Sequence, residues 1–147
     1  RVASGIDGVV STAIGVALAS RAPTYLLIGD IAMLHDSNGL IGLAQRQADV
    51  RIVCVDNRGG GIFSFLPQAS SLDAVRFEQL FGTPHESNIV LLAEAHGIPS
   101  RSVMTMDELV GQVDRRGPWL MCIATNRAEN VAVHERLNVN VKKALAS

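Results

Sequence analysis

The pattern of apolar and polar positions predicts strands and helices that follow one another along the chain. Short apolar runs rich in β-branched residues predict strands, because helices need longer segments. These runs cover residues 24–28, 51–55, 102–105 and 119–124. Longer segments between the runs predict helices. These segments cover residues 7–20, 33–45, 89–96, 106–113 and 128–145.

Elements that alternate in this way favour an α/β fold: a doubly wound, mainly parallel sheet with helices on both faces. The 147 residues fit one domain, residues 1–147. Asp7 is expected to cap the first helix, and the continuous apolar run at residues 24–28 predicts a strand buried on both faces. Ligands of such sheets bind beyond the carboxyl ends of strands, so function is expected at Gly29, Asp30 and residues 56–61.

Composition narrows the classes of function. Apolar residues make up 48% of the chain and charged residues 18%, with a formal net charge of −1. These values predict a packed core and argue against disorder and against nucleic-acid binding. Cys54 and Cys122 lie in apolar runs and are expected to be buried thiols. No apolar stretch reaches the ~18 residues of a membrane span, and no signal peptide precedes the first helix, so a cytoplasmic location is expected.

Oxygen ligands follow two of the predicted strands. Asp30 supplies a carboxylate, and Asn57, 27 positions later, supplies an amide oxygen beside a run of glycines. Hard cations such as Mg²⁺ prefer oxygen ligands and recruit phosphate oxygens to complete their coordination. The backbone N–H groups of Ile31 and Ala32, at the start of a helical segment, are expected to receive those phosphate oxygens.

This arrangement resembles the diphosphate–magnesium motif of thiamine-diphosphate enzymes. Three further stretches are similar to one branch of that family, the 2-succinyl-5-enolpyruvyl-6-hydroxy-3-cyclohexene-1-carboxylate synthases of menaquinone biosynthesis. They are RVASGIDG at residues 1–8, NRGGGIFS at residues 57–64 and FGTPH at residues 81–85. The resemblance implies that the chain is the C-terminal, diphosphate-binding part of a longer protein.

The resemblance also implies a role for individual residues. Asp30 and Asn57 would bind Mg²⁺, or Mn²⁺, through their side chains, and Gly59 through its carbonyl oxygen. Arg1 would bind an acidic group of the substrate. Residues expected to contact thiamine diphosphate are Ser4, Gly5, Ile6, Gly29, Asp30, Ile31, Ala32, Asn57, Gly59, Gly60 and Ile62. Residues expected to line the substrate pocket are Ile62, Phe63 and Leu66.

The implied reaction is the decarboxylating carboligation of 2-oxoglutarate with isochorismate, a transferase activity. The activating glutamate of such enzymes comes from a pyrimidine-binding domain of the same or a neighbouring subunit. We therefore expect no catalytic residue in this chain, no activity of the chain alone, and a homodimer or homotetramer.

Two alternatives remain open at this point. The first is another thiamine-diphosphate enzyme, of the acetolactate synthase or 2-oxoacid decarboxylase type, although Arg1 and Ile62-Phe63 argue against it. The second is a flavodoxin-like binding module without enzymatic activity, whose loops at the strand ends are only turns. His35 and Arg58 have no assigned role.

Overall fold

The computed structural model describes residues 5–146, which fall into two compact units. We call residues 5–56 and 86–124 the sheet unit, and residues 57–85 and 125–146 the glycine-loop unit. No helix among the described residues is long and apolar enough to cross a membrane.

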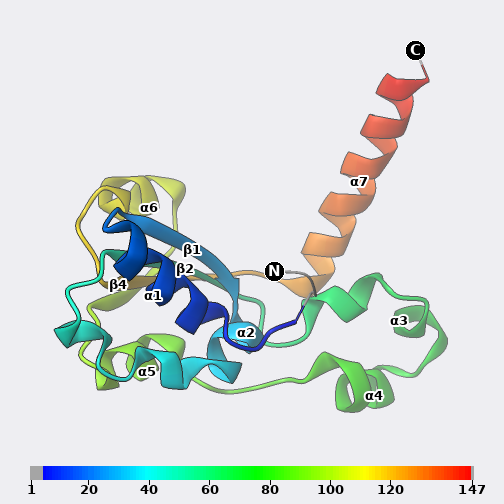
Figure 1. Cartoon of the computed structure of the whole chain (residues 1–147). Helices are drawn as coiled ribbons and strands as arrows, with labels where there is room; N and C mark the ends of the chain where they lie inside the picture. The colour runs from blue at the N-terminus through cyan, green and yellow to red at the C-terminus, as the bar shows by residue number, and fades with distance from the viewer. Residues whose placement is uncertain (1–4, 147) are drawn as a thin grey trace. The chain divides into compact units, whose positions relative to one another are not determined.

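The sheet unit is built on four parallel strands in the order β1-β2-β4-β3 (Figure 1). The four strands are β1 (Thr24–Gly29), β2 (Val50–Asp56), β3 (Ser100–Val103) and β4 (Trp119–Ala124). Parallel neighbours joined through helices are the arrangement that the alternating sequence pattern predicts, so the doubly wound α/β fold is confirmed.

Helices cover both faces of this sheet. The main core lies between one face and three helices, α1 (Val9–Ser20), α2 (Asp30–His35) and α5 (Ile89–Ala95). A smaller core lies on the other face, where α6 (Met106–Val113) packs through Leu109. Both cysteines are buried thiols that form no disulfide among the described residues, as predicted. A hydrogen bond with Cys122, together with burial, raises the pKa of the Cys54 thiol, so this thiol is held neutral.

The start of α1 is capped differently from the prediction. Gly8, in a left-handed conformation with φ of 61°, takes the N-cap position that was predicted for Asp7. The buried carboxylate of Asp36 instead accepts hydrogen bonds from the N–H of Ser11 at 2.7 Å and from its hydroxyl at 3.1 Å. It satisfies one of the N–H groups that the first turn of a helix leaves without an internal partner.

Two other predictions are wrong in detail. The first strand is not buried on both faces, since Tyr25 is 51% and Leu27 74% exposed. The helix predicted over residues 33–45 begins at Asp30, ends at His35, and is followed by the two short 3₁₀ turns η1 (Ser37–Leu40) and η2 (Leu43–Gln45). Gly42 separates these turns in a left-handed conformation, with φ of 72°, which ends regular helix.

The glycine-loop unit consists of short helical turns and one long helix. Residues 68–82 form two short helices and a π-helical turn. Asn126 caps the long helix by accepting hydrogen bonds from the N–H groups of Ala128 and Glu129 at 2.9 and 3.1 Å. The elements are η3 (Gly61–Phe65), α3 (Gln68–Ser71), α4 (Ala74–Phe77), η4 (Glu78–Gly82) and α7 (Arg127–Leu145).

An ion pair between the buried Arg51 and the partly exposed Asp49 lies at the start of β2. Arg51 donates to both carboxylate oxygens of Asp49, at 2.9 and 3.0 Å, and the N–H of Gly117 donates to the same carboxylate at 2.6 Å. Arg51 is only 6% exposed. The hydrogen bond from Arg51 is the largest cause that lowers the pKa of Asp49 below its usual value.

We expect Asp49→Asn to lower the free energy of unfolding by about 2–3 kcal/mol at pH 7, because it leaves a buried guanidinium without its counter-charge. Since the pKa of Asp49 is lowered on folding, this stabilisation is fully present above the ordinary pKa and is lost as the pH falls through the folded one. Urea unfolding of the full-length protein at several pH values measures it. A difference in unfolding free energy between wild type and Asp49→Asn that does not shrink as the pH is lowered below the ordinary pKa of an aspartate would contradict the ionic explanation. Asp114→Asn, at an exposed position, is the control.

Candidate functional site

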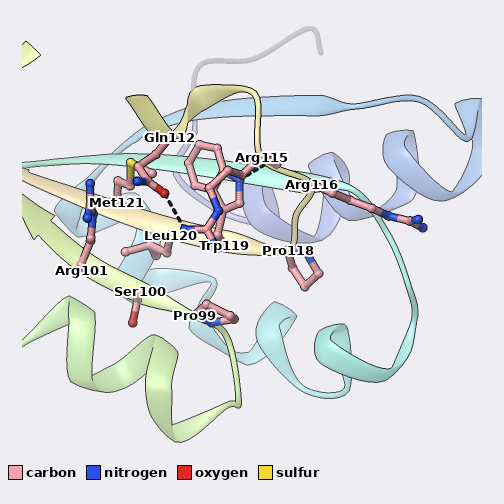
Figure 2. A pocket seen from close by; sticks show the side chains of 10 residues that line it. All are labelled: Pro99, Ser100, Arg101, Gln112, Arg115, Arg116, Pro118, Trp119, Leu120 and Met121. Carbon is pink, nitrogen blue, oxygen red and sulfur yellow. Dashed lines mark hydrogen bonds between the residues drawn. The ribbon is translucent and has the colours of Figure 1, made fainter. Parts of the chain in front are cut away.

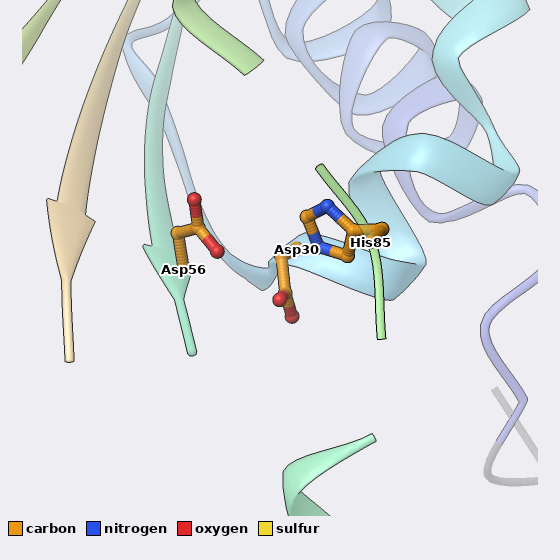
Figure 3. A group of neighbouring side chains, drawn as sticks. All are labelled: Asp30, Asp56 and His85. Carbon is orange, nitrogen blue, oxygen red and sulfur yellow. The ribbon is translucent and has the colours of Figure 1, made fainter. Parts of the chain in front are cut away.

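Two acidic residues leave the sheet side by side. Gly29 and Val55 are register partners on the neighbouring strands β1 and β2, and Asp30 and Asp56 are the residues that follow them. Figure 3 shows both side chains near the ends of their strands; His85, also drawn there, belongs to the glycine-loop unit. Carboxylate oxygens of the two aspartates lie within 4.8 Å of each other.

Both aspartates are buried, Asp30 with 2% and Asp56 with 7% of its surface exposed. Two carboxylates at this separation repel each other, and burial strengthens the repulsion. A cation bound beside them would offset the repulsion between the carboxylates and the cost of burying their charge. Carboxylate oxygens are hard donors, the kind of ligand that Mg²⁺ prefers. Asp56 was not among the predicted ligands. Its position directly after the apolar run at residues 51–55 could have indicated it as a ligand, as the corresponding position of Asp30 did.

The start of α2 also differs in detail from the prediction. The N–H of Ile31 donates to the Oδ1 atom of Asp30 at 2.9 Å. This bond holds the Asp30 carboxylate at the end of β1. A phosphate oxygen bound to Ile31 would therefore share the donor with Asp30.

The glycine loop, residues 57–61, carries the predicted amide ligand. The Oδ1 atom of Asn57 is buried and has no hydrogen-bond partner among the residues that the structure describes. Leaving a buried acceptor unsatisfied costs about 1–3 kcal/mol. A metal ion bound to this oxygen would remove that cost, so the residue fits the ligand role that its sequence position predicts.

Close packing explains why this loop needs glycines. Gly59 has φ of 152°, and a Cβ atom there would lie 2.2 Å from the carbonyl oxygen of Gly82. A Cβ atom on Gly61 would lie 2.5 Å from the Nδ2 atom of Asn57. The side chain of Asn57 therefore rests directly against the backbone of Gly61, and only hydrogen can stand between them.

This contact gives a specific probe of Asn57. Gly61→Ala would push the Asn57 side chain aside, and we expect metal affinity to fall about 10-fold or more. Stability should change by less than about 1 kcal/mol, since the crowded atom is the end of a movable side chain. Manganese titration of the full-length protein measures the affinity. Gly15→Ala, where a new Cβ meets nothing within 4 Å, is the control; equal affinity for both variants would contradict the role of Asn57.

The predicted pocket residues form an exposed apolar surface on the glycine-loop unit. Ile62 is 74%, Phe63 36% and Leu66 41% exposed. Apolar side chains gathered at a surface mark binding sites more often than isolated ones do. Their exposure fits a pocket wall better than a place in the core of this unit.

The remaining predicted residues lie near the N-terminus or at the end of β1. Arg1 and Ser4 lie outside the described residues. Gly5 and Ile6 are exposed, and Gly29 is the N-cap residue of α2 with φ of −80°.

A cavity of about 260 Å³ in the sheet unit lies at the opposite, amino ends of β3 and β4 (Figure 2). Some of its polar groups bond to one another: Arg115 donates to Gln112 at 2.7 Å, and the Trp119 indole donates to the carbonyl of Arg115 at 2.7 Å. The carboxyl ends of the strands, where ligands of this fold bind, are therefore the better candidate site.

This chain matches one known family model, and it is similar in sequence to several proteins that share one name. The family model described as thiamine pyrophosphate enzyme, C-terminal TPP binding domain, matches residues 6–116. A 2-succinyl-5-enolpyruvyl-6-hydroxy-3-cyclohexene-1-carboxylate synthase from Saccharopolyspora erythraea is 46% identical over 97% of this chain and 26% of the relative. The protein of the same name from Lysinibacillus sphaericus is 45% identical over 91% of this chain and 24% of the relative. The chain thus spans about a quarter of the length of these relatives.

Solved structures share the fold. A thiamine diphosphate-dependent 4-hydroxybenzoylformate decarboxylase from Rhodococcus jostii RHA1 superimposes with a TM-score of 0.64 at 24% identity, over 78% of this chain and 22% of that one. A thiamin diphosphate-dependent enzyme from Mycobacterium smegmatis gives a TM-score of 0.64 at 21% identity, over 83% and 22%. At these identities the likeness concerns the fold alone.

Proposed function

Because this chain belongs to the thiamine pyrophosphate enzyme family, as a C-terminal cofactor-binding domain, we propose that its two strand-end loops hold the metal and the diphosphate of the cofactor. Asp30 and Asn57 would bind Mg²⁺, or Mn²⁺, through side-chain oxygens, and Gly59 through its carbonyl. The observation that carries this proposal is the unsatisfied, buried Oδ1 atom of Asn57. The buried carboxylate pair of Asp30 and Asp56 supports it.

Other parts of the chain would hold the organic part of the cofactor. The N–H groups of Ile31 and Ala32, at the first turn of α2, would donate to the diphosphate, where the helix dipole favours negative charge. Further contacts are proposed from Ser4, Gly5, Ile6, Gly29, Gly60 and Ile62. Ile6 is 42% exposed, so its side chain is available to a bound molecule.

The names of the two synthases that resemble this chain support a specific reaction. We propose that the full-length protein joins 2-oxoglutarate, with loss of carbon dioxide, to isochorismate. Bound thiamine diphosphate supplies the electron sink for decarboxylation and carbon–carbon bond formation. The residues of this chain bind and orient the cofactor, and Ile62, Phe63 and Leu66 shield the reacting groups from water.

The chain by itself is expected to be inactive. The glutamate that activates the cofactor would come from a pyrimidine-binding domain of the same or a neighbouring subunit, so the active unit is expected to be a homodimer or homotetramer. Separately purified residues 1–147 should show no turnover, and activity here would contradict this division of roles.

An assay of the full-length protein tests the reaction. We expect carbon dioxide release from 2-oxoglutarate to be coupled to consumption of isochorismate and to require both Mg²⁺ and thiamine diphosphate. Turnover of pyruvate with no use of isochorismate would favour an acetolactate synthase or decarboxylase instead. Metal-dependent cofactor binding without either turnover would contradict the proposed reaction but not the proposed site.

Substrate binding makes a separate prediction. Arg1 is proposed to bind an acidic group of the substrate, so Arg1→Ala should raise the Michaelis constant about 10-fold or more, as expected when a charged hydrogen bond is lost. The dissociation constant of thiamine diphosphate should not change. Steady-state kinetics and cofactor titration of the full-length variant measure the two effects. A loss of cofactor affinity with an unchanged Michaelis constant would contradict the substrate role.

A further inference from the structure

We propose that Glu78 and Arg127 are positioning residues that hold the glycine loop in the conformation that presents Gly59 to the metal. The proposal rests on the metal site proposed above. It concerns only the glycine-loop unit, to which all the residues in question belong.

The two side chains form an ion pair across the unit. The Nη2 atom of Arg127, the first residue of α7, donates to the Oε2 atom of Glu78, the first residue of η4, at 2.8 Å. The side chains are 20% and 39% exposed. The pair connects positions 49 residues apart, and no local turn requires it.

The carboxylate of Glu78 lies against the backbone at Gly82. A Cβ atom on Gly82 would stand 2.2 Å from the Oε2 atom of Glu78. The carbonyl oxygen of Gly82 in turn accepts a hydrogen bond from the N–H of Gly60 at 2.7 Å. The same oxygen would lie 2.2 Å from a Cβ atom on Gly59. A continuous series of contacts therefore links Glu78 to the backbone of the glycine loop.

Arg127 also reaches the glycine loop directly. Its Nη1 atom is buried, has no hydrogen-bond partner among residues 5–146, and lies 3.4 Å from the position of a Cβ atom on Gly59. A buried donor atom left unsatisfied costs stability, so this Nη1 atom does not contribute to stabilising the fold. Its place beside Gly59 is better explained by a role at the loop itself.

The same groups face a common cavity. Asn57, Glu78 and Arg127 line a cavity of about 650 Å³ in the glycine-loop unit. The predicted amide ligand and the ion pair thus border one space. Loss of the pair would let the loop adopt other conformations, and the carbonyl of Gly59 would point at the metal for only part of the time.

Metal affinity and loop protection, measured on the full-length protein without substrate, test the proposal. We expect Arg127→Met and Glu78→Gln each to weaken Mn²⁺ binding, measured by electron paramagnetic resonance, by about 10–100-fold, the usual effect of removing a group that orients a metal ligand. Amide exchange at Gly60 in the metal-free protein should accelerate in both variants. The double variant should bind Mn²⁺ about as weakly as either single one, because the two residues act as a unit. Arg127→Lys, which keeps the charge but loses the planar fork, should lie between wild type and Arg127→Met.

Controls on the same helix separate this role from a general effect of charge. Glu135→Gln and Arg136→Met change exposed positions of α7 and should leave Mn²⁺ affinity and Gly60 exchange unchanged. Unchanged affinity in Glu78→Gln and Arg127→Lys would overturn the positioning role, even if Arg127→Met failed to fold. In that case a lost Mn²⁺ site in Asp30→Ala would show that the proposed metal site stands without it, whereas Mn²⁺ binding retained by Asp30→Ala would contradict the metal site itself.

Discussion

Asp30→Ala should abolish metal-dependent binding of thiamine diphosphate. Removal of a group that only orients a metal ligand costs about 10–100-fold in affinity, so removal of the ligand itself should cost more than about 100-fold. Asp30 is only 2% exposed and lies beside a second carboxylate, so the substitution removes a charged oxygen ligand from a buried position. Calorimetric titration of the full-length protein with thiamine diphosphate, with and without Mg²⁺, measures the effect.

Two further variants sharpen this test. Asp56→Asn keeps the shape of its side chain and removes the second buried charge, so a moderate loss of metal affinity is expected. Asp107→Asn changes an exposed carboxylate in the first turn of α6 and should have no effect. Affinity and metal dependence that remain at the wild-type level in Asp30→Ala would contradict the ligand assignment.

The second large effect separates metal binding from stability. Asn57→Ala removes an amide oxygen that is buried and has no hydrogen-bond partner among residues 5–146. We therefore expect the metal-free variant to unfold with an unchanged free energy, or one raised by up to about 1 kcal/mol, while Mn²⁺ affinity falls about 100-fold or more. Urea unfolding in the presence of a chelator and Mn²⁺ titration give the two numbers.

The opposite pattern would exclude this explanation. A metal-free variant destabilised by more than about 2 kcal/mol, with intact metal affinity, would mean that Asn57 serves the fold. Asn57→Asp adds an independent readout. It supplies a charged oxygen ligand in the same place, so it should keep the Mn²⁺ binding that Asn57→Ala loses.

The α/β architecture could be predicted from the sequence because strands and helices are indicated by patterns of neighbouring residues. The spacing of apolar residues and the length of the apolar runs predicted all four parallel strands. The acidic residue and the glycines that follow two of these strands marked Asp30 and the glycine loop as the candidate site. The first strand was misjudged for a physical reason. An apolar run indicates burial, yet Tyr25 and Leu27 remain exposed on β1, which is an edge strand of the sheet.

Interactions between distant positions could not be predicted. Asp36 caps a helix that begins 27 residues earlier, and Glu78 pairs with Arg127 across 49 positions. Neither pair has a spacing that a helix or a turn imposes, so only the folded chain brings the partners together. The same holds for Asp56, whose approach to Asp30 depends on the register of β1 and β2.

Anomalous diffraction from crystals of the full-length protein grown with Mn²⁺ and thiamine diphosphate tests the central claim most directly. We predict an anomalous peak about 2.0–2.2 Å from a carboxylate oxygen of Asp30, from the Oδ1 atom of Asn57 and from the carbonyl oxygen of Gly59, with diphosphate oxygens among the remaining ligands. A manganese ion that is bound to the diphosphate but touches neither Asp30 nor Asn57 would contradict the account.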